Sequence, residues 1–166
     1  MISRITQGLG AGYAATAVMD ASQTTVIPAI SSWAEGYLSQ EQGEQQEGPS
    51  EGQAEESSPV KVARRGASFL GVEVNQQGAE TWGNRVHWAY GIGWGIAYLL
   101  FYRRPGLRSG LTYGAGLWLG SDELLLWGLG VAKAPSQYPP KTHFQALAAH
   151  LVYGVTLGLL ARGIRG

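Results

Sequence analysis

The sequence predicts an all-α fold: a single membrane domain over residues 1–166, built as a bundle of four transmembrane helices with a long polar first loop. A membrane span needs about 20 apolar residues. Four stretches have this length, at residues 5–30, 86–102, 111–132 and 143–164. Pairs of glycines four residues apart occur in every stretch. Charge lies elsewhere, because nine of the twelve acidic residues fall between residues 33 and 84.

The first stretch, residues 5–30, contains Asp20 as its only charged residue. The run Ala15-Thr16-Ala17 resembles a signal-peptide cleavage site, but the apolar character continues to Ile30. A cleaved signal peptide would end near its small-residue site. We therefore expect an uncleaved first helix.

The segment 39–58 is rich in Gln, Glu, Gly and Ser and has almost no apolar residue to bury. This composition predicts a disordered acidic loop, most simply a solvated spacer. Residues 59–77, which follow, carry several apolar positions. They predict a short surface element whose type the sequence leaves open.

The three later stretches have almost no charge. Residues 86–102 are uncharged unless His87 is protonated, and residues 111–132 are interrupted by Asp122 and Glu123. Residues 143–164 carry a formal charge only at Arg162 when the histidines are neutral. Helices of a soluble four-helix bundle would combine an apolar stripe with a charged face. Because these stretches lack such a face, they favour a lipid environment.

Glycine spacing supports membrane helices, because small residues four apart let helix backbones approach closely in lipid. In a water-soluble helix each interior glycine would cost about 1 kcal/mol relative to alanine. Chance produces such pairs in any glycine-rich chain, but pairs in every stretch predict helix-packing faces. The expected packing glycines are Gly8, Gly12, Gly91, Gly95, Gly110, Gly114, Gly116, Gly120, Gly154 and Gly158.

Basic residues near the spans set the expected orientation. Six arginines flank the side that holds both termini, and three basic residues flank the other side. Cytoplasmic loops carry an excess of Lys and Arg, so both termini are expected in the cytoplasm. The six are Arg4, Arg103, Arg104, Arg108, Arg162 and Arg165, and the three are Arg85, Lys133 and Lys141. Tyr98, Tyr102 and Tyr113 are expected at the headgroup level of the arginine-rich side.

Several classes of function are disfavoured. The chain has no cysteine, which excludes disulfides, thiolate metal sites and cysteine nucleophiles. It has no basic footprint for nucleic acid. The sequence has no phosphate-binding P-loop motif and no His-Glu-x-x-His motif. We expect a non-enzymatic protein without metal or cofactor, surrounded by the lipid bilayer and assembled as a homo-oligomer or in a larger membrane complex.

Ionisable groups inside lipid are costly and mark functional sites by default. At the rise of an α-helix, Asp20 and Glu123 lie roughly 14–15 Å from the non-cytoplasmic helix ends, and His150 roughly 10–11 Å. We expect Asp20, Asp122, Glu123 and His150 to form an intramembrane polar cluster, with His87 at the rim of its span. Asp122 and Glu123 are about 100° apart on an α-helix, so only one of them is expected to point fully inward.

Three functions from different classes follow. The glycine faces predict a structural or accessory membrane subunit that acts through helix–helix contacts, with the polar cluster as a packing latch. Alternatively, the cluster predicts a small transporter or channel with a proton or ion path. The third function is a haem- or quinone-associated redox subunit with His87 or His150 as an axial ligand. His143, by contrast, is expected at the membrane interface.

Motifs on three helices resemble the YagU-like family of small bacterial inner-membrane proteins. The chain opens with Gly8-Leu9-Gly10-Ala11-Gly12 and reaches Met19-Asp20. The second helix begins with Arg85-Val86-His87-Trp88-Ala89-Tyr90-Gly91, and the last contains His150-Leu151-Val152-Tyr153-Gly154. The resemblance implies a multi-pass protein of the bacterial inner membrane and supplies no catalytic residue. The loop rich in Gln and Glu departs from the family's pattern.

Overall fold

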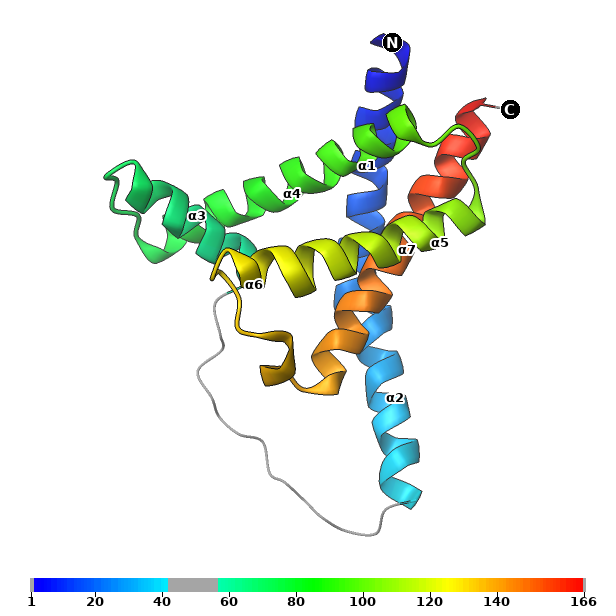
Figure 1. The fold of residues 1–166 in the computed structure, drawn as a ribbon. Helices are drawn as coiled ribbons and strands as arrows, with labels where there is room; N and C mark the ends of the chain where they lie inside the picture. Colours follow the sequence, from blue (N-terminus) through cyan, green and yellow to red (C-terminus); the bar gives the residue numbers. More distant parts are fainter. Residues whose placement is uncertain (1, 42–56, 166) are drawn as a thin grey trace.

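A computed structural model describes residues 2–41 and 57–165, which are helical apart from short connections and contain no strand. The all-α class is therefore confirmed. Figure 1 shows the order of the elements: α1 (Ile2–Thr24), α2 (Val26–Glu41), α3 (Ser58–Phe69), α4 (Gln76–Phe101), α5 (Leu107–Leu117), the π-helix η1 (Trp118–Leu125), α6 (Leu126–Gly128), the 3₁₀ turn η2 (Pro135–Gln137) and α7 (Pro140–Arg165). Most of the expected acidic loop 39–58 lies outside the described residues.

The first apolar stretch forms two helices, because the chain breaks at Thr25 between α1 and α2. Pro28 explains the break, since proline has no N–H and clashes with the carbonyl four residues earlier. The hydroxyls of Thr24 and Thr25 both donate to the carbonyl of Ala21, at 3.0 and 2.6 Å. The single helix expected over residues 5–30 is therefore α1 followed by the start of α2, which continue each other in Figure 1.

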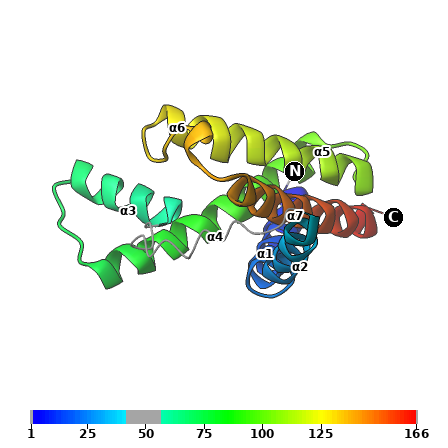
Figure 2. The ribbon, with the colours of Figure 1, turned by 90° about the horizontal axis from the view of Figure 1, so that it is seen from below.

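Helix α4 begins at Gln76, ten residues before the expected start of the second span. Asn75 provides the N-cap, because its Oδ1 accepts a hydrogen bond of 2.8 Å from the amide of Gly78. The preceding helix, α3, folds back along the first half of α4 in both views (Figures 1 and 2). The surface element left open over residues 59–77 is thus a helix.

The third stretch runs as one continuous helical rod from Leu107 to Gly128, through α5, η1 and α6. It begins four residues before the expected start at residue 111 and ends four residues before the expected end at residue 132. Gly130 reverses the chain with a φ of 65°, which favours glycine. Arg65 of α3 donates to the carbonyl of Leu129 at 2.7 Å and so ties α3 to the end of this rod.

Two antiparallel helix crossings hold the fold together. In the first, α1 crosses α4: Gly8 faces Ile96, and Gly12 faces Ile92 and Gly95. In the second, α5 crosses α7: their glycines at 110, 114, 154 and 158 face the opposite backbone. A Cβ atom at any of these crossing glycines would overlap backbone atoms of the partner helix, so these close approaches require glycine.

Not every expected packing glycine lies at a crossing. Gly91 faces the side chain of Thr16 on α1, whereas Gly116 and Gly120 have no atom of another element near the position of a Cβ. A spacing of four residues does not by itself determine which glycines contact another helix. On α5 the face with Gly110 and Gly114 packs against α7. Gly116 is two residues away from that face.

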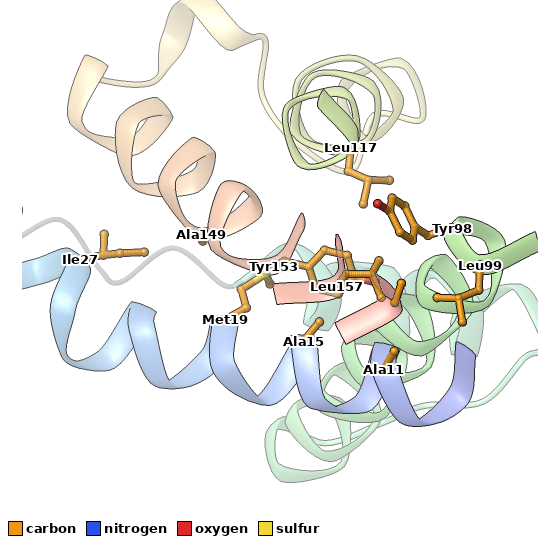
Figure 3. Close-up of a cluster of buried hydrophobic side chains, with 11 residues drawn as sticks. Ala11, Ala15, Met19, Ile27, Tyr98, Leu99, Leu117, Ala149, Tyr153 and Leu157 are labelled. Atoms are coloured by element: carbon orange, nitrogen blue, oxygen red, sulfur yellow. The ribbon is translucent and has the colours of Figure 1, made fainter. Parts of the chain in front are cut away.

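The core lies where α1 meets α7 (Figure 3). Ala11, Ala15 and Met19 of α1 pack against Tyr153 and Leu157 of α7. Tyr98 is fully buried beside this core, and its hydroxyl lies 2.6 Å from Ser109 Oγ. The ring and hydroxyl of Tyr98 therefore join α4 to α5.

Among the described helices, one is long and apolar enough to cross a membrane: Pro140–Ile164 in α7, with a mean hydropathy of 1.5. Of its apolar window, 33% is buried inside the protein. Helices α1 and α4 are long enough for a span. Neither contains a stretch of span length that is apolar enough to cross a membrane.

The crossing predicts opposite effects for two neighbouring glycines on α5. Gly114→Ala should destabilise the protein by about 1–3 kcal/mol, because its Cβ would overlap the carbonyl of His150. Gly116→Ala should stabilise it by up to about 1 kcal/mol, since the added methyl meets open space and alanine favours helix. Unfolding in detergent micelles measures both. Equal effects of the two variants would contradict the crossing.

Candidate functional site: a cavity lined by acid–histidine pairs

A cavity of about 790 Å³ lies between α1, α3, α4, η1, α6 and α7. Its volume is within the range of about 300–1,000 Å³ that is typical of small-molecule sites. All three histidines of the chain line it. Its walls also include each of the three acidic residues expected inside the bilayer, namely Asp20, Asp122 and Glu123.

The first pair joins α1 to α4. His87 Nε2 lies 2.8 Å from Asp20 Oδ1, and the side chains are 25% and 35% exposed. His87 was expected at the rim of its span. Helix α4 starts ten residues earlier than predicted, and His87 lies within this helix beside Asp20 of α1.

The second pair joins η1 to α7. His143 Nδ1 lies 2.6 Å from Glu123 Oε1, and His143 Nε2 lies 3.0 Å from the carbonyl oxygen of Pro135. Because the carbonyl can only accept, Nε2 carries a proton, and a second proton must lie between Nδ1 and the carboxylate. The pair is then neutral as a unit, whichever partner holds that second proton. His143 therefore belongs to the site and is more than an interfacial residue.

The third pair also joins η1 to α7. His150 Nδ1 donates to the carbonyl of Ala146 at 2.9 Å and lies 3.7 Å from Asp122 Oδ2. With Nδ1 fixed as a donor, a neutral His150 has its lone pair on Nε2. No described residue forms a hydrogen bond with Nε2, which leaves it able to take up a proton from the cavity.

The π-helix η1 explains how two adjacent acids reach two different histidines. Its i→i+5 hydrogen bonding widens the turn and reduces the angle between neighbouring side chains. Asp122 and Glu123 both line the cavity, with side chains 35% and 12% exposed. Glu123 was also expected to meet His150, but it pairs with His143 instead. π-Helical turns are frequently found at functional sites.

The expected cluster thus lies around one cavity, although its members form separate pairs rather than a single contact network. Other polar groups at the wall are Glu80, whose carboxylate accepts from Gln76 at 2.9 Å, and Lys133. The Tyr153 hydroxyl donates to the carbonyl of Gly91 at 2.6 Å. Within the described ranges, no three acidic or histidine side chains converge closely enough to hold a metal ion.

An internal repeat relates the two crossings. Residues 8–20 and 110–122 share the pattern Gly-Leu-x-x-Gly followed by an aspartate eight residues later. Residues 87–95 and 150–158 share His-x-x-Tyr-Gly-x-x-x-Gly. The repeat therefore makes α1 equivalent to the α5–η1 rod and α4 equivalent to α7. It also makes the Asp20–His87 and Asp122–His150 pairs equivalent, a signal that inspection of each stretch by itself misses.

The equivalent crossings differ in register. Gly8 faces Ile96 on α4, whereas its equivalent Gly110 faces Val155, which corresponds to residue 92. The partner position differs by four residues, about one helical turn or 5.4 Å. This shift brings His143 opposite Glu123 in the second half, a pair without a counterpart in the first.

Comparisons with protein-family models, with curated proteins and with solved structures found no match. The geometry and chemistry of the cavity are therefore the basis for assigning a function.

The pairing can be tested by double-mutant cycles of stability. Glu123→Gln and His143→Ala should couple by about 0.5–3 kcal/mol, the range for residues in direct contact. Glu123→Gln and His150→Ala should be additive within about 0.5 kcal/mol. Unfolding in micelles gives both values. A larger coupling to His150 than to His143 would refute the observed pairing.

Proposed function

We propose that the chain is a multi-pass membrane protein that moves protons across the bilayer through the acid–histidine cavity, as a small proton-coupled carrier. The arrangement of three acid–imidazole pairs around one cavity carries this proposal. Chains of Asp, Glu and His inside membranes form the proton relays of pumps and transporters. Imidazole suits this role because it changes charge between pH 5 and 8.

A membrane location is supported by apolar side chains that remain exposed on all the long helices. Water would make such broad apolar exposure unfavourable. Lipid would cover it, and glycine crossings are a common way for membrane helices to pack. Examples with 38–53% exposure are Leu9 and Val18 on α1, Ile30 on α2, Leu111, Leu119 and Leu124 along the third rod, and Leu159, Leu160 and Ile164 on α7.

The arrangement of the ends fits four spans with both termini in the cytoplasm of an inner membrane. Both termini and the connection between α4 and α5 lie at the same end of the molecule (Figure 1). That end holds Arg4, Arg103, Arg104, Arg108 and Arg162 by their positions along the chain. The excess of arginine supports a cytoplasmic location for this end, and the location is the one that the YagU-like resemblance implies.

The internal repeat further supports a carrier. Many transporters consist of two structural repeats, with the binding site at their interface and transport by movement of one repeat relative to the other. Here the cavity receives side chains from both halves. Their glycine crossings occupy registers one turn apart, so the same motif packs in two ways.

An accessory subunit is the alternative function. Polar side chains that only lock helices together would pack without a cavity, whereas these line about 790 Å³ of space. For the redox subunit, an axial ligand needs a free ring nitrogen: Asp20 occupies Nε2 of His87, which leaves Nε2 of His150 as the candidate. A larger complex recovered with the purified protein would favour the accessory function.

Single cysteines test the four-span arrangement, because the natural chain has none. Ser3→Cys and Arg104→Cys should react only from the cytoplasmic side of oriented vesicles, and Ser136→Cys only from the opposite side. A membrane-impermeant maleimide measures the labelling. Labelling of all three positions from one side would rule out the four-span topology.

Proton flux tests the function. In liposomes with an imposed pH gradient and a potassium–valinomycin clamp, the protein should dissipate the gradient, as measured by an entrapped pH-sensitive dye. Asp20→Asn and Asp122→Asn should each reduce the rate by about tenfold or more, within the range of proton-transfer contributions. Glu73→Gln is the matched control, because Glu73 is exposed and outside the cavity wall. Flux no faster than in protein-free liposomes would contradict the proposal.

A further inference from the structure

We infer that the cavity binds a small organic cation and releases protons as the cation enters; the inference rests on the proposed carrier function and names its substrate class. The charged groups that face the cavity lie on α1, α4, η1, α7 and the segment after α6, whereas α3, α5 and α6 contribute only uncharged residues. These groups are Asp20 on α1, Glu80 and His87 on α4, Asp122 and Glu123 on η1, Lys133 after α6, and His143 and His150 on α7.

The charge balance of these groups favours a cation. The Glu123–His143 pair is neutral as a unit, because its hydrogen bonds require two protons between the partners. The remaining carboxylates of Asp20, Glu80 and Asp122 exceed the single positive charge of Lys133 by two when the other imidazoles are neutral. An excess negative charge in a partly dry cavity attracts a positive ligand.

The two remaining imidazoles couple this charge to protons. His87 and His150 occupy equivalent positions in the repeat, and each lies beside an aspartate at 2.8 or 3.7 Å. Protonation of both cancels the two excess negative charges. A cation and the two imidazole protons therefore offset the same excess negative charge, so cation binding favours the release of protons from His87 and His150.

The uncharged part of the wall identifies the cation as organic. Tyr90, Trp94, Tyr138 and Tyr153 line the cavity, and Trp94 packs edge-on to Tyr90 with ring centroids 5.8 Å apart. Aromatic faces attract organic ammonium groups through cation–π contacts. Apolar residues such as Met19 and Leu126 complete the wall. In the described residues, no convergent set of ligands would coordinate a bare metal ion.

Calorimetric titration of the purified full-length protein in mild detergent tests the inference. The probe is benzyltrimethylammonium, whose charge is permanent, and the comparison ligand is benzenesulfonate, an anion of similar size. The cation should bind at least tenfold more tightly at pH 8.5 than at pH 5.5. Near pH 6.5, titrations in two buffers of different ionisation enthalpy should show up to about one proton released per cation, because the probe carries one positive charge. Benzenesulfonate should not bind at pH 8.5.

Variants locate the site. Asp122→Asn should weaken cation binding at least tenfold at pH 8.5, whereas the matched control Glu73→Gln should stay within twofold of the natural protein. Circular dichroism and thermal unfolding verify that both variants fold. The pH dependence and the proton count need no variant, so they test the inference even if Asp122→Asn fails to fold.

The outcomes separate this inference from the proposed function. Binding that is independent of pH, binding of the anion as tight as that of the cation, or no binding by a protein that still conducts protons would each overturn the cation inference and leave the carrier function. Cation binding with proton release, in a protein without proton flux, would support the site and overturn transport.

Discussion

Close contact between helix backbones at the two glycine crossings is the constraint on which the rest of the structure depends. Where α1 meets α4 and α5 meets α7, a side chain larger than hydrogen would overlap the opposite backbone. This proximity is what allows short polar side chains on neighbouring helices to reach each other. Asp20 and His87 extend from helices that Gly12 and Gly95 hold in contact, so the site depends on packing several turns away.

The acid–histidine pairs reconcile polar chemistry with an apolar bundle. An unpaired carboxylate in such surroundings would be costly, and a neighbouring imidazole reduces that cost. The π-helix η1 carries both Asp122 and Glu123, which pair with histidines of α7. The same segment also contains a feature that lowers the stability of the fold. Trp118, in the same turn, has a buried indole nitrogen with no hydrogen-bond partner among the described residues, which costs about 1–3 kcal/mol.

Hydropathy and residue spacing predicted the helical class, the packing role of glycine and the candidate polar residues, because these depend on local sequence. Which acidic side chain pairs with which histidine could not be predicted in this way. The depths of Glu123 and His150 were estimated for straight α-helices, and the π-turn with the one-turn register shift moved Glu123 to His143 instead. Asn75 is a typical N-cap residue and marks the early start of α4. Apolar length alone does not reveal this start, because residues 76–85 are largely polar. The repeat was also visible in the sequence, although only when residues 87–95 and 150–158 are compared directly.

The three imidazoles provide the most direct measurement of the central claim, because the chain has no other histidine. Nitrogen-15 NMR of the labelled rings in micelles reports which ring nitrogen carries a proton. The structure predicts three different spectra: hydrogen bonds on both nitrogens of His143, a proton on Nδ1 of neutral His150, and a hydrogen bond to Asp20 at Nε2 of His87 that disappears in Asp20→Asn. Three rings with the same tautomer, and no change at His87 in Asp20→Asn, would contradict the paired site.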